Sequence, residues 1–430
     1  MTTESLPLIE VDRLQLGMYV VLDVGWRNHP FAFSSFILKT DEQLQQLRSI
    51  GVPKVRYCPE RSTVEPLPPA APSDIATAVD ILAHAYDAPL EPPPRVLRLP
   101  VDPLQRQEAA LKRAEAEFQK AAQEHQRILK QYELNPHQAR RLAEQLGDEV
   151  LQWTAEGRQV AIRLLSPQVG EQPSGHEIGV SALATLLGRE CGLGVDELRE
   201  LALAALLHDI GKRGLPSFLH EDDGRLSEAE RRTYRRHVEL GIEYGEAMGL
   251  PLAVIRAIAE HHERCDGLGF PAALPGDKLC TTGRILAIVN RYQNLVCPQH
   301  VGAGISPHAA LRQMYSSERS HFDPVFLPRF VRLMGIYPPG TLVELTDQRR
   351  AIVIASRPGM SLAPRVQVVE SPDDDTPSLA FDLDMASGPK VRTSLRPDQL
   401  NPRWAQRARQ FARSAIFLEP QDDADTSFTH

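Results

Sequence analysis

One stretch near the middle of the chain constrains its fold more than any other: Leu206-Leu207-His208-Asp209-Ile210-Gly211-Lys212. Residues 198–207 are so rich in leucine and alanine that they predict a helix with most of its surface buried. His208 and Asp209 follow without an apolar spacer. A buried carboxylate is costly unless it is paired or bound to a metal, so this helix end requires a partner, and a divalent cation would serve. Lys212, about one turn after His208, is predicted to hold a negatively charged substrate on the same side.

Other metal-capable side chains lie on neighbouring predicted helices. The apolar patterns and start signals predict helices over residues 176–191, 196–211, 227–248, 251–263 and 282–296. Five imidazoles and one carboxylate on or next to them form a candidate ligand set: His176, His208, Asp209, His237, His261 and His262. Five imidazoles exceed the needs of one tetrahedral site, so the set predicts two adjacent metals with Asp209 as a bridge. Two such metals polarise a phosphate group and activate water, as phosphodiester hydrolysis requires.

These motifs occur in the order and spacing of a known family. Residues 165–336 resemble the HD-GYP subgroup of the HD phosphohydrolase superfamily. The resemblance implies an all-helical bundle that hydrolyses the bacterial second messenger cyclic di-GMP, to pGpG or to GMP, with two or three iron or manganese ions. It is carried by His208-Asp209-Ile210-Gly211-Lys212-x-Gly214-Leu215-Pro216, Arg236-His237-x-x-x-Gly241, His261-His262-Glu263-x-x-Asp266-Gly267-x-Gly269-Phe270-Pro271, Arg284-Ile285-Leu286-Ala287 and His321-Phe322-Asp323-Pro324.

The resemblance also implies roles for individual residues. Asp209 and Lys212 would be catalytic, with Lys212 contacting the substrate phosphate. Phe270 occupies a position where the family commonly has tyrosine, so the aromatic ring is kept and a hydroxyl is lost. The metal ligands would be His176, His208, Asp209, His237, His261, His262 and Asn290, with two divalent ions, iron or manganese. A signature loop beside the site, linked in the family to protein partners, would comprise Asp266, Gly267, Gly269, Phe270 and Pro271.

Two departures from the family pattern leave alternatives open. Asn290 stands where the family has a metal-binding aspartate, and an uncharged amide oxygen binds a cation more weakly. Residues 296–300, Val-Cys-Pro-Gln-His, lack the arginine that holds the dinucleotide in the family. The first hypothesis is a cyclic di-GMP phosphodiesterase. The second is a degenerate signalling module that binds metal or nucleotide and acts through protein contacts, and a third is an HD-superfamily hydrolase of another nucleotide.

The predicted fold class is mainly α: an HD-type helical bundle with a small N-terminal α/β domain and a small C-terminal β appendage. The N-terminal part resembles the short domain of unknown function that often precedes HD-GYP domains, through Leu14-x-x-Gly17-Met18-Tyr19-Val20, Trp26 and the stretch from Pro30 to Phe36. The predicted divisions are residues 1–62 for this domain, a proline-rich linker at 63–103, a helical connector at 104–165, the HD-GYP domain at 166–336, a C-terminal β-rich part with a helix at 337–418, and a disordered tail at 419–430.

Local patterns predict the remaining elements. Strands are predicted at 7–11, 18–22, 55–57, 341–345, 351–354, 365–369 and 379–383, and helices at 41–50, 104–133, 137–165 and 402–416. The helix at 104–133 carries a heptad seam of Leu111, Ala114, Phe118, Ala121, His125, Ile128 and Tyr132. The seam fits either a homodimer contact or packing against the rest of the same chain, and His125 on it is not expected to bind metal.

Composition narrows the class of partners and the location. A net charge of -8 and a pI near 6.0 give no basic field for polymeric nucleic acid. The chain shows neither a signal peptide nor an apolar run long enough to span a membrane. Five scattered cysteines without a Cys-x-x-Cys pair are typical of reduced thiols, so a cytoplasmic location is expected.

Overall fold

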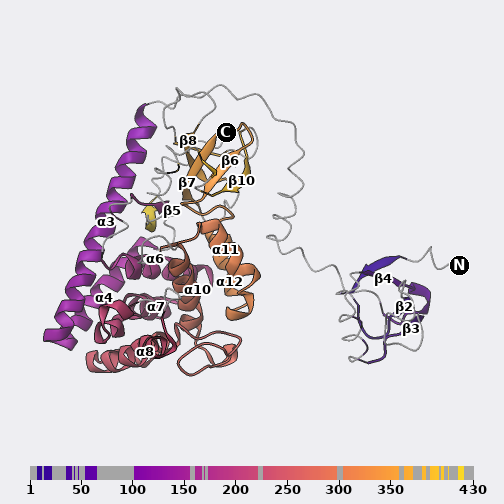
Figure 1. The fold of residues 1–430 in the computed structure, drawn as a ribbon, viewed down its shortest axis with the longest axis horizontal. Coiled ribbons are helices and arrows are strands. Elements are labelled where there is room, and N and C mark those ends of the chain that lie inside the picture. Colours follow the sequence, from indigo (N-terminus) through magenta and orange to yellow (C-terminus); the bar gives the residue numbers. More distant parts are fainter. Residues whose placement is uncertain are drawn as a thin grey trace. The chain divides into compact units, whose positions relative to one another are not determined.

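The computed structural model describes residues 7–11, 14–21, 35–40, 43, 47, 54–64, 101–154, 160–166, 169, 173–220, 226–297, 304–357, 363–370, 380–383, 388–396, 399–400, 405 and 415–420, and the account below is confined to them. The chain divides into two compact units, residues 1–89 and 90–430. Each unit is described by itself (Figure 1).

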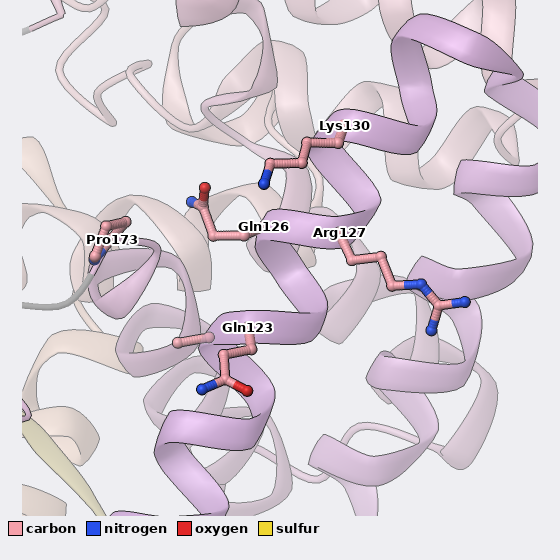
Figure 2. Close-up of a pocket in the computed structure, with 6 residues that line it drawn as sticks. Gln123, Gln126, Arg127, Lys130 and Pro173 are labelled. Atoms are coloured by element: carbon pink, nitrogen blue, oxygen red, sulfur yellow. The ribbon is translucent and has the colours of Figure 1, made fainter.

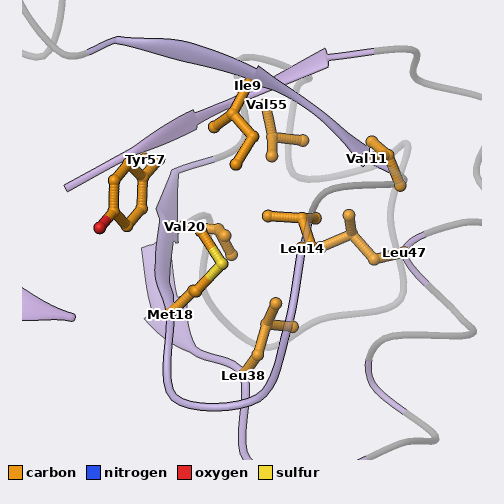
Figure 3. Packing of buried hydrophobic residues seen from close by; sticks show 9 residues of the cluster. All are labelled: Ile9, Val11, Leu14, Met18, Val20, Leu38, Leu47, Val55 and Tyr57. Atoms are coloured by element: carbon orange, nitrogen blue, oxygen red, sulfur yellow. The ribbon is translucent and has the colours of Figure 1, made fainter. Parts of the chain in front are cut away.

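The first unit contains an antiparallel sheet in the order β1-β4-β2-β3. Its strands are β1 (Leu8–Glu10), β2 (Tyr19–Val21), β3 (Ser35–Ile37) and β4 (Lys54–Tyr57). The three strands predicted here are confirmed, and β3 is additional. The predicted helix at 41–50 falls almost entirely outside the described residues. Apolar side chains from the strands and from the segments between them form a core in which they point toward one another (Figure 3): Ile9, Val11, Leu14, Met18, Val20, Leu38, Leu47, Val55 and Tyr57.

The second unit is built around a bundle of helices (Figure 1). The mainly helical fold class predicted from the sequence is confirmed. Asn135 begins the second helix by accepting a hydrogen bond from the Gln138 amide, with Pro136 in the first turn. The helices are α3 (Val101–Leu134), α4 (Pro136–Trp153), α6 (Gly175–Glu190), α7 (Val195–Leu207), α8 (Glu228–Met248), α9 (Leu252–Glu260), α10 (Thr281–Val296), α11 (Pro307–Ser316) and α12 (Phe326–Met334).

Helices α6 and α7 form the centre of the bundle, because most of their residues are buried. Small residues allow this close packing: a Cβ added at Gly188 in α6 would lie 2.9 Å from the side chains of Leu198 and Leu201 in α7. Ser227 and Glu230 form the predicted capping box that begins α8. Among the described helices, none has both the length and the apolar character needed to cross a bilayer.

The long helix α3 lies along one flank of the bundle (Figure 1). It begins at Val101, inside the segment predicted as linker. The middle of its heptad seam is buried against the same chain: Ala114, Phe118, Ala121, His125 and Ile128. The Phe118 ring meets the Phe417 ring edge-on, with centroids 5.4 Å apart. Of the two predicted alternatives, a homodimer contact and packing against the rest of the same chain, the seam shows the second.

The C-terminal sheet is larger than predicted. The four predicted strands are present as β6 (Leu342–Leu345), β7 (Arg350–Ser356), β8 (Arg365–Glu370) and β9 (Ala380–Asp382). Further strands are β5 (Val160–Leu164), β10 (Val391–Leu395) and β11 (Ile416–Pro420). The main path of the sheet runs β10-β6-β7-β5-β11, and β8 pairs with β7 and β9.

This sheet corrects three expectations. The predicted helix at 137–165 ends at Trp153, and its last part is strand β5, in the middle of the sheet. The predicted helix at 402–416 is wrong at its end, since Ile416 begins β11. The predicted disordered tail at 419–430 is wrong at its start, since Glu419 pairs with Ala161. In each case the pairing of two segments far apart in sequence overrides a local pattern.

Candidate metal centre

The predicted ligands come from several helices, some from their ends and some from their interiors, and converge in the bundle. His176 lies in the first turn of α6, and His208 is the C-cap of α7. Asp209 follows and precedes the 3-10 helix η6 (Ile210–Gly214), which carries Lys212. The others are His237 within α8, His261 and His262 directly after α9, and Asn290 within α10.

The structure brings the six predicted histidine and aspartate residues into two groups that share Asp209. One consists of His176, His208 and Asp209, and the other of Asp209, His237, His261 and His262; within each group the donor atoms lie within 4.8 Å of one another. Asp209 Oδ1 is 3.6 Å from His237 Nε2 and 3.7 Å from His261 Nε2, while its Oδ2 is 3.2 Å from His208 Nε2. One carboxylate thus faces both groups through different oxygens.

Backbone carbonyls fix the tautomers of three of these histidines. The Nδ1–H groups of His208, His237 and His261 donate to the carbonyl three residues earlier, at 2.8, 2.6 and 2.5 Å respectively. Each accepting carbonyl lies in the helix that precedes or contains the histidine. Since a neutral imidazole carries one proton, Nε2 of each ring is left with a free lone pair directed to the shared centre.

Unsatisfied atoms in the centre show that the residues fit metal ions. His208 Nε2, His262 Nε2 and Asp209 Oδ1 are buried and lack a hydrogen-bond partner. Leaving such atoms unpaired is costly, whereas cation binding satisfies all of them. Imidazole nitrogens with a bridging carboxylate are a donor set that suits divalent transition metals, including iron, manganese and zinc.

Burial sets the charge state of the centre. It lowers the pKa of His176 to about 4 and that of His237 to about 3, and the pKa of His262 also falls well below its usual value. Burial alone would raise the pKa of Asp209, but His208 and Lys212 beside it outweigh this and hold the pKa well below the usual range. Burial alone would also lower the pKa of His208, but Asp209 beside it outweighs this and raises it. At neutral pH the centre therefore presents an ionised carboxylate and the neutral imidazoles of His176, His237 and His262.

Asn290 lies where the resemblance expects a ligand. Its side chain is buried, and its Oδ1 lies 3.0 Å from His176 Nε2. The Asn294 amide, one turn later in α10, donates to the same oxygen at 3.1 Å. The amide oxygen of Asn290 is thus directed toward the group formed by His176, His208 and Asp209. Of the segment at 296–300, Val296 and Cys297 are described, and the other three residues lie outside the described part of the chain.

The signature loop is adjacent to the second group of ligands. The Phe270 ring stacks on the His262 ring, with centroids 4.5 Å apart and planes 20° apart. The Arg235 guanidinium lies 5.1 Å from the centre of the same ring. A Cβ on Gly269 would fall 2.4 Å from the Arg264 amide nitrogen, so this close turn requires glycine. The phenylalanine keeps the ring contact with a ligand histidine that a tyrosine would also make.

Two carboxylates organise the loop, and sequence analysis assigned no such task to either. The buried Glu263 accepts hydrogen bonds from the amides of Ala272 and Leu274, at 2.7 and 3.0 Å. Asp266 accepts from the Leu268 amide at 3.1 Å and from Arg264 Nε at 3.0 Å. For Glu263 the sequence did contain a signal of this role. A carboxylate that directly follows a buried pair of histidines needs hydrogen-bond donors.

Gly211 permits the close approach of η6 to α8. A Cβ at this position would lie 2.0 Å from the His237 carbonyl oxygen and 2.5 Å from the Gly241 amide nitrogen. Gly211→Ala should therefore lower the free energy of unfolding of the metal-free protein by about 3 kcal/mol or more. Gly147→Ala is the control. Gly147 lies within α4, and a Cβ there would meet no atom nearer than 3.9 Å, so the alanine should stabilise the helix by about 0.5–1 kcal/mol. Denaturant unfolding of both variants checks this prediction. An equal loss of unfolding free energy in the two variants would contradict the close contact at Gly211.

A surface pocket lies against α3, apart from this centre. It is lined by Ala122, Gln123, Gln126, Arg127, Lys130 and Pro173, none of which is a candidate ligand. Figure 2 shows the side chains of Gln126 and Lys130 extending toward Pro173, while Arg127 extends the other way. Pro173 directly precedes Ser174, the N-cap of α6.

A helical bundle that gathers histidines and a bridging aspartate at helix ends defines a metal-dependent HD domain. Residues 126–326 match the family model described as HD domain, and residues 7–143 match one described as a domain of unknown function, DUF3391. The chain therefore contains an HD domain, with this domain of unknown function in front of it.

Curated relatives of the chain include phosphodiesterases. A cyclic di-GMP phosphodiesterase of Pseudomonas aeruginosa is 28% identical over 373 residues, which is 86% of each chain. A cyclic di-GMP phosphodiesterase response regulator of Xanthomonas campestris is 31% identical over 147 residues, covering 34% of this chain and 39% of the relative. A solved structure of an HD-GYP-like protein from Bdellovibrio bacteriovorus covers 76% of this chain and 97% of its own, at 14% identity and a TM-score of 0.38.

Proposed function

We propose that this protein is a phosphodiesterase that hydrolyses cyclic di-GMP to pGpG or GMP with two divalent metal ions, iron or manganese. The observation that carries the proposal is the pair of ligand groups joined at Asp209, with three buried donor atoms that lack partners. His176, His208 and Asn290 would hold one ion with Asp209, and His237, His261 and His262 would hold the other. When bound, the two ions supply Lewis acidity toward a phosphate group and toward water.

Residues of the chain contribute charge, orientation and exclusion of water. Asp209 supplies the negative charge that both ligand groups share, and its low pKa keeps it ionised. Lys212 Nζ, 2.7 Å from Asp209 Oδ2, stays protonated, because this carboxylate outweighs the effect of burial and raises the pKa of the lysine. Its positive charge would neutralise charge that develops on a phosphate. The buried rings around the centre limit the access of bulk water.

The test is turnover of cyclic di-GMP by protein that is purified without oxygen and loaded with Fe(II) or Mn(II), with metal content measured on the same sample. Hydrolysis together with about two ions per chain is the expected result. A panel with other cyclic dinucleotides identifies the substrate, and product analysis distinguishes pGpG from GMP. Two bound ions with no hydrolysis of any cyclic dinucleotide would overturn the enzymatic proposal.

Such an outcome would favour a second candidate, a signalling module that binds metal or nucleotide with little turnover. Asn290 favours this candidate, because an amide oxygen brings no charge to the ligand group that contains His176. The exposed face of the signature loop offers a protein contact in either case, since Leu268 is 72% exposed at its tip. We place the protein in the cytoplasm, in keeping with its cysteine usage and a nucleotide substrate.

The role of Lys212 predicts a loss of turnover without a loss of metal. Lys212→Met keeps most of the apolar stem and removes the charge, so kcat/KM should fall about 100-fold while the metal content stays unchanged. Arg213→Met removes a neighbouring charge that pairs with Glu133, away from the ligands, and should leave kcat/KM unchanged. Steady-state kinetics with metal analysis checks the prediction. Equal activity of the two variants would show that Lys212 has no part in the reaction.

A further inference from the structure

His125 is a buried polar residue on a seam of apolar ones. It lies in α3, outside the ligand set, and only 1% of its surface is exposed. Alanine, phenylalanine and isoleucine occupy the other buried seam positions. Since burying an imidazole is costly unless its nitrogens are bonded, its two contacts indicate what it does.

One ring nitrogen of His125 donates a hydrogen bond, and the other accepts one. Nε2 lies 2.6 Å from the carbonyl oxygen of Leu206, which can only accept, so Nε2 carries the proton. Nδ1 is then an acceptor, and the Ser174 hydroxyl donates to it at 2.7 Å. Gln126 Nε2 in turn donates to Ser174 Oγ at 2.6 Å. Every donor and acceptor in this chain of bonds is matched, so a single tautomer and a single orientation of the ring are selected.

Both partners of His125 lie two residues before a predicted metal ligand. Ser174 is the N-cap of α6, held at φ 68°, and His176 follows in the first turn. Leu206 lies in the last turn of α7, where the final carbonyls of a helix have no amide partner within it. His208 is the C-cap of the same helix. One imidazole, on a third helix, thus joins the Ser174 side chain before His176 to the Leu206 carbonyl before His208.

We propose that His125 is a positioning residue for the metal site formed by His176, His208 and Asp209. By holding the start of α6 and the end of α7 at a fixed separation, it sets the distance between the two histidines that share this site. The inference rests on the proposed metal-dependent function. The other ligand group receives His237, His261 and His262 from α8 and the end of α9, to which His125 makes no hydrogen bond among the described residues. Loss of His125 should therefore weaken one ion more than the other, because the second group shares only Asp209 with the first.

The experiment titrates metal-free protein with Mn²⁺ alone and resolves the two binding events. In His125→Leu, which keeps the apolar packing and removes both hydrogen bonds, the affinity of one site should fall about 10- to 100-fold. The affinity of the other site should fall less, because it shares only Asp209 with the first. His125→Gln, with a nitrogen placed like Nε2, keeps the donor to Leu206 and should recover part of the loss.

Two further variants separate positioning from general stability. Ser174→Gly removes the hydroxyl at a residue whose positive φ suits glycine, leaves His125 in place, and should weaken the same site as His125→Leu. Glu115→Ala is the matched control: it removes another hydrogen bond made by α3, to the Ser166 amide at 2.8 Å, away from the ligands. It should lower the unfolding midpoint without changing either Mn²⁺ affinity.

The outcomes distinguish this inference from the proposed function. A wild-type protein that binds no Mn²⁺ would overturn both. Two unchanged binding events in folded His125→Leu and Ser174→Gly would overturn the role of His125 alone. Equal weakening of both sites would also overturn it, because Ser174 and Leu206 precede histidines of only one ligand group.

Discussion

Replacing Asp209 by asparagine is expected to abolish turnover, with a loss of at least about 1,000-fold, and to reduce bound metal to below about one ion per chain. The two carboxylate oxygens of Asp209 face different ligand groups, so a single substitution removes negative charge from both groups. The shape of the side chain is unchanged, and only its charge and one acceptor are lost. Metal analysis and turnover of cyclic di-GMP on one sample check the result.

The same variant also has an effect in the absence of metal. Lys212 is largely buried beside Asp209, and loss of the carboxylate leaves its charge without that partner. The free energy of unfolding of the metal-free protein should fall by about 3 kcal/mol. Asp196→Asn is the control, because that side chain is 96% exposed on the first turn of α7 and pairs only loosely with Arg199. Metal binding by Asp209→Asn at the wild-type level would show that Asp209 does not join the two groups.

Restoring a carboxylate with Asn290→Asp is expected to strengthen binding of the ion held by His176, His208 and Asp209 at least about tenfold. The surroundings already suit a carboxylate, since Asn294 donates to the oxygen of residue 290, and His176 Nε2 lies 3.0 Å from it. If the charge of this one ligand limits the site, turnover should rise by a similar factor. Mn²⁺ titration and steady-state kinetics measure the two effects separately.

The matched control is Gln123→Glu, which adds the same charge at an exposed position of α3 that is not a candidate ligand. It should raise neither affinity nor turnover. Tighter metal binding by Asn290→Asp without a gain in turnover would favour the signalling module, because the lost activity would then depend on more than residue 290. Equal responses of the two variants would show that general charge, and not coordination, is responsible.

Much of the centre could be predicted because its ligands sit in short local motifs. His208 and Asp209 follow a helix whose burial is evident from its composition, and the structure places them at the end of α7. His261 and His262 likewise follow a short apolar helix. Motifs of this kind need no information about distant segments, and the structure gathers the five predicted histidines around the carboxylate of Asp209.

Other features depend on contacts that no local pattern contains. The segment Val160–Leu164 fits a helix or a strand equally well, and only its pairing with β7 and β11 decides for a strand. His125 occupies a seam position that predicts helix packing, and its partners are 49 and 81 residues away. Sequence could therefore name the candidate ligands, but it could not show the contacts that His125 makes with the segments before two of them.

The place of β5 in the sheet has a consequence for how the chain folds. This strand follows α4 in sequence, yet its neighbours are β7 and β11, and the register pairs Ile162 with both Ser356 and Leu418. Pairing between segments this far apart in sequence is slow, and the pairing with β11 has to await synthesis of residue 418. During translation, the edge of β5 that faces β11 therefore stays unpaired even after β7 has been made. A ribosome-bound chain that stops before Ile416 should expose this edge, together with the Phe118 and Trp153 rings that the Phe417 ring meets in the finished protein.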